Sequence, residues 1–260
     1  MIYNYAGNKI LNDFADDMTF ESAYDATSHT YYTVLRIAKQ RRDGTMQFPF
    51  ARVPGGTQKT AYELEQSEPW ELIINAGLDM TEGLYIENGI VIRDTAADVH
   101  VGLMPLTIDS NGDLGYEDAD TTGKGASYVA NGIVSAVCGF FPIIENYEDY
   151  SYPTDIYNTD TERWQHAQRQ IIGQYGNGDY CIITSEGRNF HNSVGLTMTD
   201  AQRVCKGLGL KFAYNLDGGG STELMIKRKM VNLVYEGTTG RVRDSFIVFN
   251  GTTTFQVPQY

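Results

Sequence analysis

Three consecutive glycines follow an aspartate in the stretch Asn215-Leu-Asp-Gly-Gly-Gly-Ser-Thr222. Glycine loses more backbone entropy on folding than any other residue, so such a run marks a required backbone geometry. If an apolar strand ends here, Asp217 emerges beside bare main chain, whose N–H groups suit an anion or sugar oxygens. The residues that would contact such a ligand are Gly218, Gly219, Gly220, Ser221 and Thr222. A tight turn capped by Asp217 explains the same stretch, and the stretch alone leaves both interpretations open.

Asn75 and several arginines are the other candidates for chemistry. Asn75 ends an apolar run and precedes Ala-Gly, so it either faces a pocket or closes a turn. Arg169 heads an apolar strand, where it needs a carboxylate or a bound anion as its partner. Three further arginines flank predicted strand ends: Arg188, Arg241 and Arg243. Together they could form a local cation cluster, although a surface ion pair accounts for Arg169 equally well.

Several common site types are excluded by spacing. No lysine follows the glycines where a phosphate-binding Walker A loop requires one. Residues 109–113 have the first spacings of a calcium loop, but Leu114 stands where that loop needs glycine. Ser221 has no Gly-x-Ser-x-Gly elbow, and His191 is the only nearby candidate for its base. We therefore expect no metal site and no cofactor, with an assisting divalent cation left open.

The charge balance of the chain limits its partners. The net charge is −13 and the sequence pI about 4.7, which argues against non-specific binding to nucleic acid or anionic membranes. We find no signal peptide and no apolar run of about 18 residues. The three cysteines stand singly in apolar surroundings, which predicts reduced core residues. We expect a protein made in the cytoplasm, without a membrane span.

Turn signals and periodicity predict the elements that must position these residues. Asn-Gly pairs between alternating apolar residues predict β-hairpins at 88–89, 111–112 and 177–178, with positive φ at both turn residues. A strand is expected from Thr30, a short helix over 60–67, and a long irregular loop over 145–164. The fold class is α+β: strand-rich mixed or antiparallel sheets with several β-hairpins and a few packed helices.

One helix leads directly to the glycine run. Thr197-Met-Thr-Asp200 is a capping box that starts a helix, and Gly207 and Gly209 end it. A buried strand follows at once and stops at the glycines. We divide the chain into an acidic N-terminal extension (1–28), one domain (29–252) and a C-terminal tail (253–260), with no internal repeat.

The order of the motifs resembles that of the phosphodiester glycosidase family over about residues 30–250. The Asn-Leu-Asp-Gly-Gly-Gly-Ser-Thr block behind its capped helix is the specific part. The motifs that carry the resemblance are Asn75-Ala-Gly, Gly83-Leu-x-Ile-x-Asn-Gly, GFFPIIENYE (139–148), Arg169-x-x-x-Gly173, Glu186-Gly-Arg, Gly195-Leu-Thr and Asn215 to Thr222. The chain departs from the family at Glu186, where aspartate is usual, and at Glu223, where a small or hydroxyl residue is usual.

The resemblance implies a hydrolase that cleaves a sugar-1-phosphodiester linkage and releases a sugar and a phosphomonoester. By residue type it implies catalytic roles for Asp217, Arg169 and Asn75. Asp217 would act as general base or electrostatic stabiliser, while Arg169, helped by Arg188 or Arg241, would hold the phosphate. Asn75 and the backbone of 218–220 would position the sugar.

Two alternatives stay open at this point. One is a non-catalytic glycan-binding structural module, for example of a phage tail, joined to a virion or larger assembly through the N-terminal segment. The other is a glycosidase acting on ordinary uncharged glycosides, which would not need the arginine cluster. In every case the expected partner is a glycan or sugar phosphate.

Overall fold

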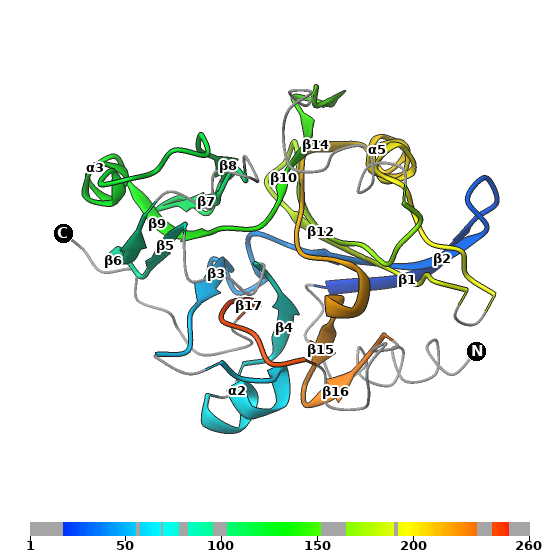
Figure 1. The fold of residues 1–260 in the computed structure, drawn as a ribbon, viewed down its shortest axis with the longest axis horizontal. Helices are drawn as coiled ribbons and strands as arrows, with labels where there is room; N and C mark the ends of the chain where they lie inside the picture. The colour runs from blue at the N-terminus through cyan, green and yellow to red at the C-terminus, as the bar shows by residue number, and fades with distance from the viewer. Residues whose placement is uncertain are drawn as a thin grey trace.

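The computed structural model describes residues 18–55, 58–68, 70–77, 83–95, 103–151, 165–189, 192–232 and 241–249. Their strands form three sheets (Figure 1). Every strand pair among these residues is antiparallel. The predicted α+β class, rich in strands and hairpins, is confirmed.

The largest sheet has seven strands. In spatial order they are β1 (Met18–Asp25), β2 (Thr30–Ile37), β13 (Tyr180–Ser185), β12 (Gln170–Tyr175), β14 (Leu210–Asn215), β10 (Phe141–Glu145) and β11 (Glu148–Asp149). Its central strands are buried along nearly their whole length: β13 is buried at all six positions, and β12 and β14 at five of six. Such runs fit strands that are covered on both faces.

The two other sheets have five strands each. One contains β16 (Lys229–Met230), β15 (Leu224–Ile226), β4 (Leu72–Asn75), β17 (Phe246–Phe249) and β3 (Pro49–Arg52). The other contains β6 (Ile90–Asp94), β5 (Leu84–Glu87), β9 (Ile133–Val137), β7 (Leu106–Asp109) and β8 (Leu114–Tyr116). The large apolar core cluster draws residues from all three sheets, so the sheets share one core.

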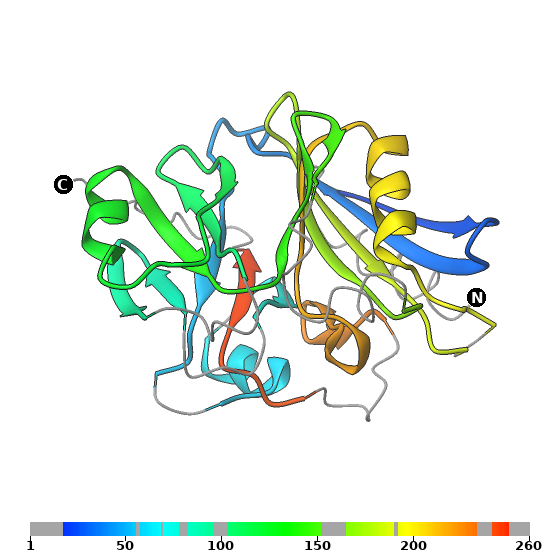
Figure 2. The same cartoon turned by 45° about the horizontal axis from the view of Figure 1, so that its top comes forward.

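Three helices cover these sheets in the described part of the chain. They are α2 (Ala61–Ser67), α3 (Gly125–Ala130) and α5 (Met198–Gly207). Helix α5 packs on β10 and β14 and lies across the seven-stranded sheet (Figure 2). The capping box predicted for it is present, with Thr197 Oγ1 accepting from Asp200 N over 3.1 Å. The helix predicted over 60–67 is α2, which has a capping box of its own, and α3 was not predicted.

The hairpins are confirmed at all three Asn-Gly pairs, but their turns differ. Asn88 and Gly89 both have positive φ, 51° and 73°, as a two-residue turn requires. At the hairpins over 109–113 and 175–179, the prediction of two positive φ angles is wrong, since only the glycine has one. These loops are longer, and a left-handed glycine closes them. The loop over 109–113 is thus a hairpin turn, as its missing calcium-loop glycine indicated.

The structure describes only part of the segments that the sequence assigned to the N-terminal extension, the long loop and the C-terminal tail. Residues 18–25, assigned from sequence to an N-terminal extension, form β1 and pair along their whole length with β2. Residues 1–17 and 253–260 lie outside the described residues, as does most of the loop predicted over 145–164. Within that loop, residues 148–149 form β11. The three cysteines are buried and free, as predicted.

Candidate functional site

Asp217 lies where β14 leaves the seven-stranded sheet and the chain turns into the five-stranded sheet that contains β4. Its main-chain N–H donates to the carbonyl of Ala76 over 3.0 Å, directly after β4. The N–H of Gly219 donates to the carbonyl of Gln168 over 2.8 Å, just before β12. A single 3-10 turn, η1 (Gly219–Ser221), follows. The aspartate is therefore fixed at a junction of two sheets.

At Gly218 and Gly219, the missing side chain leaves space for other groups of the protein. A Cβ on Gly218 would lie 2.7 Å from the carbonyl oxygen of Gln168. Gly219 has φ 58°, and a Cβ there would lie 2.7 Å from Nη2 of Arg188. The first two glycines thus let the turn press against a main-chain carbonyl and an arginine. The same bare turn carries the Asp217 side chain.

Arg243 forms an ion pair with Asp217. Its Nη1 lies 3.4 Å from Asp217 Oδ2, and the two residues are only 3% and 7% exposed. Within the described residues, Nε and Nη2 of Arg243 are buried without a hydrogen-bond partner. Burial raises the pKa of Asp217 to about 6, against the opposing effects of Arg243 and the Ser221 hydroxyl. The pair therefore combines a carboxylate with a guanidinium that has two nitrogen atoms, Nε and Nη2, available to donate to a ligand.

Glu223 is a second buried carboxyl group in the same region. It is 0% exposed, and its Oε1 accepts from the main-chain N–H of Arg241 over 2.6 Å. In the described part of the chain, its Oε2 has no hydrogen-bond partner. Burial raises the pKa of Glu223 to about 7, against Arg241 and Arg243, while the charge of Asp217 raises it further. Sequence reasoning noted Glu223 only as a departure from a family pattern.

Asn75 joins the two carboxyl-bearing residues through their backbones. Its Nδ2 donates to the main-chain carbonyl of Asp217 over 2.6 Å. Its Oδ1 accepts from the main-chain N–H of Glu223 over 2.9 Å. Both functional groups of this fully buried amide are thus used by the protein itself. Asn75 fixes the spacing of Asp217 and Glu223.

Arg169 lies beside Gly218 but directs two of its donors to main-chain carbonyls. Its Nε donates to Leu196 over 3.0 Å and its Nη2 to Gln165 over 2.8 Å. The residue is 3% exposed, and its own N–H donates to the Ser185 hydroxyl. Arg169 thereby ties the start of β12 to the loop that precedes α5.

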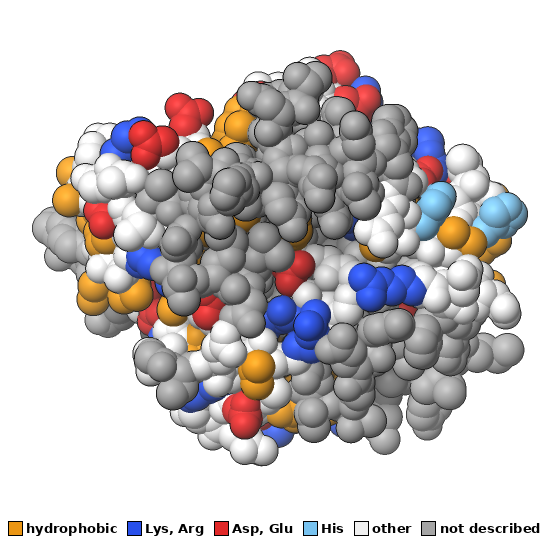
Figure 3. Space-filling model, in the orientation of Figure 1, with side chains coloured by type: hydrophobic (Ala, Val, Ile, Leu, Met, Phe, Trp, Pro, Cys, Tyr) orange, Lys and Arg blue, Asp and Glu red, His pale blue; other side chains and the backbone are white. Residues whose placement is uncertain are grey.

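The structure gathers the residues that the sequence singled out. Asn75, Asp217 and the 218–222 turn are in direct contact, with Arg188 over Gly219 and Arg241 at Glu223. Basic side chains are visible near the middle of the face in Figure 3, despite the acidic net charge. Arg243, named from sequence as a member of the possible cation cluster, makes the ion pair with Asp217. His191 lies outside the described residues.

Two features of the described residues bear on the class of site. No group of three or more His, Cys, Asp or Glu side chains there is arranged to hold a metal ion. None of the helices described is long and apolar enough to cross a membrane. The arrangement around Asp217 consists of carboxyl groups, arginines and main-chain donors.

Comparison with known proteins gives a family match and similar folds. The family model described as phosphodiester glycosidase matches residues 56–249. The zebrafish N-acetylglucosamine-1-phosphodiester alpha-N-acetylglucosaminidase catalytic domain, auto-inhibited by its pro-peptide, has a TM-score of 0.70 at 13% identity, over 90% of this chain and 82% of that one. A hypothetical protein from Synechocystis has a TM-score of 0.64 at 14% identity, over 90% and 62%. At these identities the likeness shows the fold.

One curated relative is similar over part of the sequence. The SPbeta prophage-derived uncharacterized protein YomE of Bacillus subtilis (strain 168) is 35% identical over 80 residues. The match spans 31% of this chain and 12% of that protein. This chain therefore corresponds to a small part of that relative.

Proposed function

We propose that this chain, which belongs to the phosphodiester glycosidase family, hydrolyses a sugar-1-phosphodiester to a sugar and a phosphomonoester. The observation that carries the proposal is the buried Asp217–Arg243 pair beside the glycine turn. A substrate with an anomeric carbon bonded to a phosphate needs both parts of this pair. The carboxylate would act at the anomeric carbon, and the guanidinium would bind and stabilise the phosphate.

The phosphate is held by arginines in our proposal. Arg243 offers Nε and Nη2, whose buried N–H groups find no acceptor among the described residues. A phosphate oxygen would supply that acceptor, and charge-assisted bonds of this kind are short and strong. Arg188 lies against Gly219, and the main-chain N–H of Arg241 donates to Glu223, so both arginines add positive charge nearby. We assign Arg169 a positioning role, because two of its donors go to carbonyls.

Asp217 is the general base in this reaction. A water oxygen forms a bond to the anomeric carbon while its proton passes to the Asp217 carboxylate. The bond between that carbon and the phosphate oxygen breaks, and its electron pair leaves with the phosphate. A phosphate is a weakly basic leaving group, so stabilising the oxocarbenium-like centre and the leaving anion matters more than protonation. With its pKa raised to about 6, Asp217 is ionised at neutral pH yet basic enough to accept a proton.

The experiment compares glycosyl phosphodiesters with uncharged 4-nitrophenyl glycosides of the same sugars. We expect turnover of a phosphodiester, and loss of about 10²–10⁴-fold in kcat for Asp217→Asn, as for other general bases. Arg188→Met should raise KM for the phosphodiester by about 10- to 150-fold, since it removes charge-assisted bonds of roughly 1.5–3 kcal/mol. Arg42→Met, in an exposed arginine of the loop after β2, is the matched control and should leave KM unchanged.

Two results would overturn the proposal in different directions. Turnover of uncharged glycosides alone would identify an ordinary glycosidase. Glycan binding with no turnover of any substrate would favour a structural glycan-binding module. The prophage origin of the partial relative is the reason for testing that second candidate as well.

A further inference from the structure

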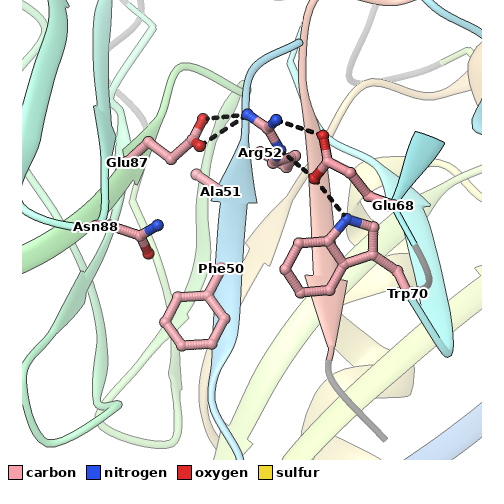
Figure 4. A pocket seen from close by; sticks show the side chains of 7 residues that line it. All are labelled: Phe50, Ala51, Arg52, Glu68, Trp70, Glu87 and Asn88. Atoms are coloured by element: carbon pink, nitrogen blue, oxygen red, sulfur yellow. Dashed lines mark hydrogen bonds and ion pairs between the residues drawn. The ribbon is translucent and has the colours of Figure 1, made fainter. Parts of the chain in front are cut away.

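A pocket of about 240 Å³ lies away from Asp217, between the edge strand β3 and the β5–β6 hairpin (Figure 4). The segment that follows α2 forms its other wall. The lining residues are Phe50, Ala51, Arg52, Glu68, Trp70, Glu87 and Asn88. Two aromatic rings stand here beside four polar or charged side chains, a lining that offers a ligand many hydrogen-bonding groups.

Arg52 holds two carboxylates in fixed positions at one side of the pocket. Its Nη1 donates to both oxygens of Glu87, over 2.7 and 2.9 Å. Its Nε donates to Glu68 Oε2 over 2.6 Å, and its Nη2 pairs with Glu68 Oε1. One cation between two anions leaves a net charge of −1, which disfavours an anionic ligand. Glu68 Oε1 and Glu87 Oε1 each accept from Arg52 alone, so each keeps acceptor capacity for one further donor.

The aromatic wall is equally fixed. Trp70 Nε1 donates to Glu68 Oε2 over 3.1 Å, which sets the orientation of the indole. The indole lies beneath Glu68 and beside the ring of Phe50 (Figure 4). Trp70 is half-buried, and Phe50 is buried in the small core cluster under α2. An aromatic face carries negative potential and attracts weakly positive C–H groups, such as those on one face of a pyranose ring.

Asn88 supplies an unused amide at the opposite side of the pocket. It is the first residue of the β5–β6 turn, with φ 51°. No other described residue hydrogen-bonds its side chain, and the stick view shows Asn88 and Trp70 on opposite sides of Phe50 (Figure 4). An amide both donates and accepts, so it suits a hydroxyl or acetamido group.

We propose that this pocket binds an uncharged sugar residue. Sugar hydroxyls would donate to Glu68 and Glu87 and exchange hydrogen bonds with Asn88, while the ring face stacks on Trp70. A cation would have to compete with Arg52 for the same two carboxylates, and an anion would be repelled by them. A sugar can use all three features of the pocket at once: its hydroxyls bind the fixed carboxylates and the amide, and its ring face packs on the indole.

The pocket is distinct from the site around Asp217. Arg52 pairs with Phe246 across β3 and β17, and Phe246 pairs with Asn75 across β17 and β4. Two strand spacings therefore separate Arg52 from Asn75, about 10 Å between backbones. The inference goes beyond the proposed hydrolysis, because sugar binding here requires neither phosphate nor turnover.

Fluorescence of Trp70 gives a direct test in the full chain. The protein contains two tryptophans, so Trp164→Phe leaves Trp70 as the only indole. We expect maltotriose, cellotriose or N,N′-diacetylchitobiose to shift its emission in a saturable way. Choline chloride is the cationic comparison. Saturation by choline with none by the saccharides, or no response to any of these ligands, would overturn the proposal.

A turn substitution locates the binding without disturbing the fold. Asn88→Gly removes the amide and keeps a residue that tolerates positive φ. We expect it to weaken saccharide binding by about tenfold, the loss of one or two hydrogen bonds. Asn146→Gly is the matched control, since Asn146 has φ 51° in the exposed turn between β10 and β11. Equal affinity in the two variants would place the sugar elsewhere and contradict the assignment.

Discussion

Asp217 and Arg243 lie 3.4 Å apart in surroundings from which water is almost excluded, and Arg243 keeps two donors without a partner among the described residues. Burying charge is unfavourable unless the charge is paired and hydrogen-bonded. The pair is close, but its hydrogen bonding is incomplete within the described chain. A bound anion would complete it, which connects this relationship to phosphate binding and to the predictions below.

The rate of hydrolysis should depend on pH through Asp217. Burial raises the pKa of Asp217 to about 6, so the base is protonated and inactive below that pH. We expect kcat/KM for a glycosyl phosphodiester to rise as pH increases through about 6 and to level off above it. Initial rates between pH 4.5 and 8.5 measure this. A profile that falls through pH 6 would assign Asp217 the opposite role, that of an acid.

Glu223 should make the folded state less stable as pH rises. Burial raises its pKa to about 7, above the ordinary value near 4.3 that it has when unfolded. The folded state therefore binds the proton more tightly, and stability falls between about pH 4.3 and 7 and is level above. Glu223→Gln should remove this loss, which is on the order of 3 kcal/mol at pH 8.

Urea unfolding of the wild-type chain and Glu223→Gln at pH 5 and pH 8 measures that difference. Glu21→Gln controls for the loss of one negative charge, because Glu21 is exposed in β1. If Glu223→Gln changes stability equally at both pH values, the carboxyl group does not titrate in this range.

Asn75→Ala should reduce both stability and turnover. It removes two buried hydrogen bonds, to Asp217 and Glu223, at a cost of roughly 2–4 kcal/mol. Asn232→Ala is a matched control: Asn232 also bridges two main-chain groups, those of Thr222 and Leu224. We expect similar losses in thermal stability, but a decrease in kcat at permissive temperature only for Asn75→Ala. Equal kcat in the two variants would show that Asn75 has no special part in placing Asp217.

Gly218→Ala should destabilise the protein, whereas Gly207→Ala should not. A Cβ at Gly218 would lie 2.7 Å from the main-chain oxygen of Gln168, and overpacking against backbone costs about 1–3 kcal/mol. A Cβ at Gly207, the last residue of α5, meets nothing within 4 Å. Alanine there should stabilise the helix by up to about 1 kcal/mol. Melting temperatures of the two variants test the contrast, and a neutral Gly218→Ala would mean that the turn can shift.

Local features of the sequence were sufficient to predict the hairpins and the capped helix. The Asn-Gly turns depend on residues next to one another, and the Thr197–Asp200 capping box spans one helical turn. Short-range chemistry of this kind acts the same way wherever the chain folds. The order of motifs also indicated the family that matches residues 56–249.

The composition of the site depended on contacts between distant residues. Asn75 reaches Asp217 and Glu223 across separations of 142 and 148 residues, which no local pattern reveals. Arg169 and Arg243 both precede apolar strands in the sequence. In the fold, Arg169 donates to main-chain carbonyls, whereas Arg243 forms an ion pair with Asp217. The sequence determined that an aspartate, glycines and arginines would stand at strand ends. Only the tertiary structure decided which arginine meets the aspartate and how deeply both are buried, because burial and pairing of charges arise when separate sheets pack together.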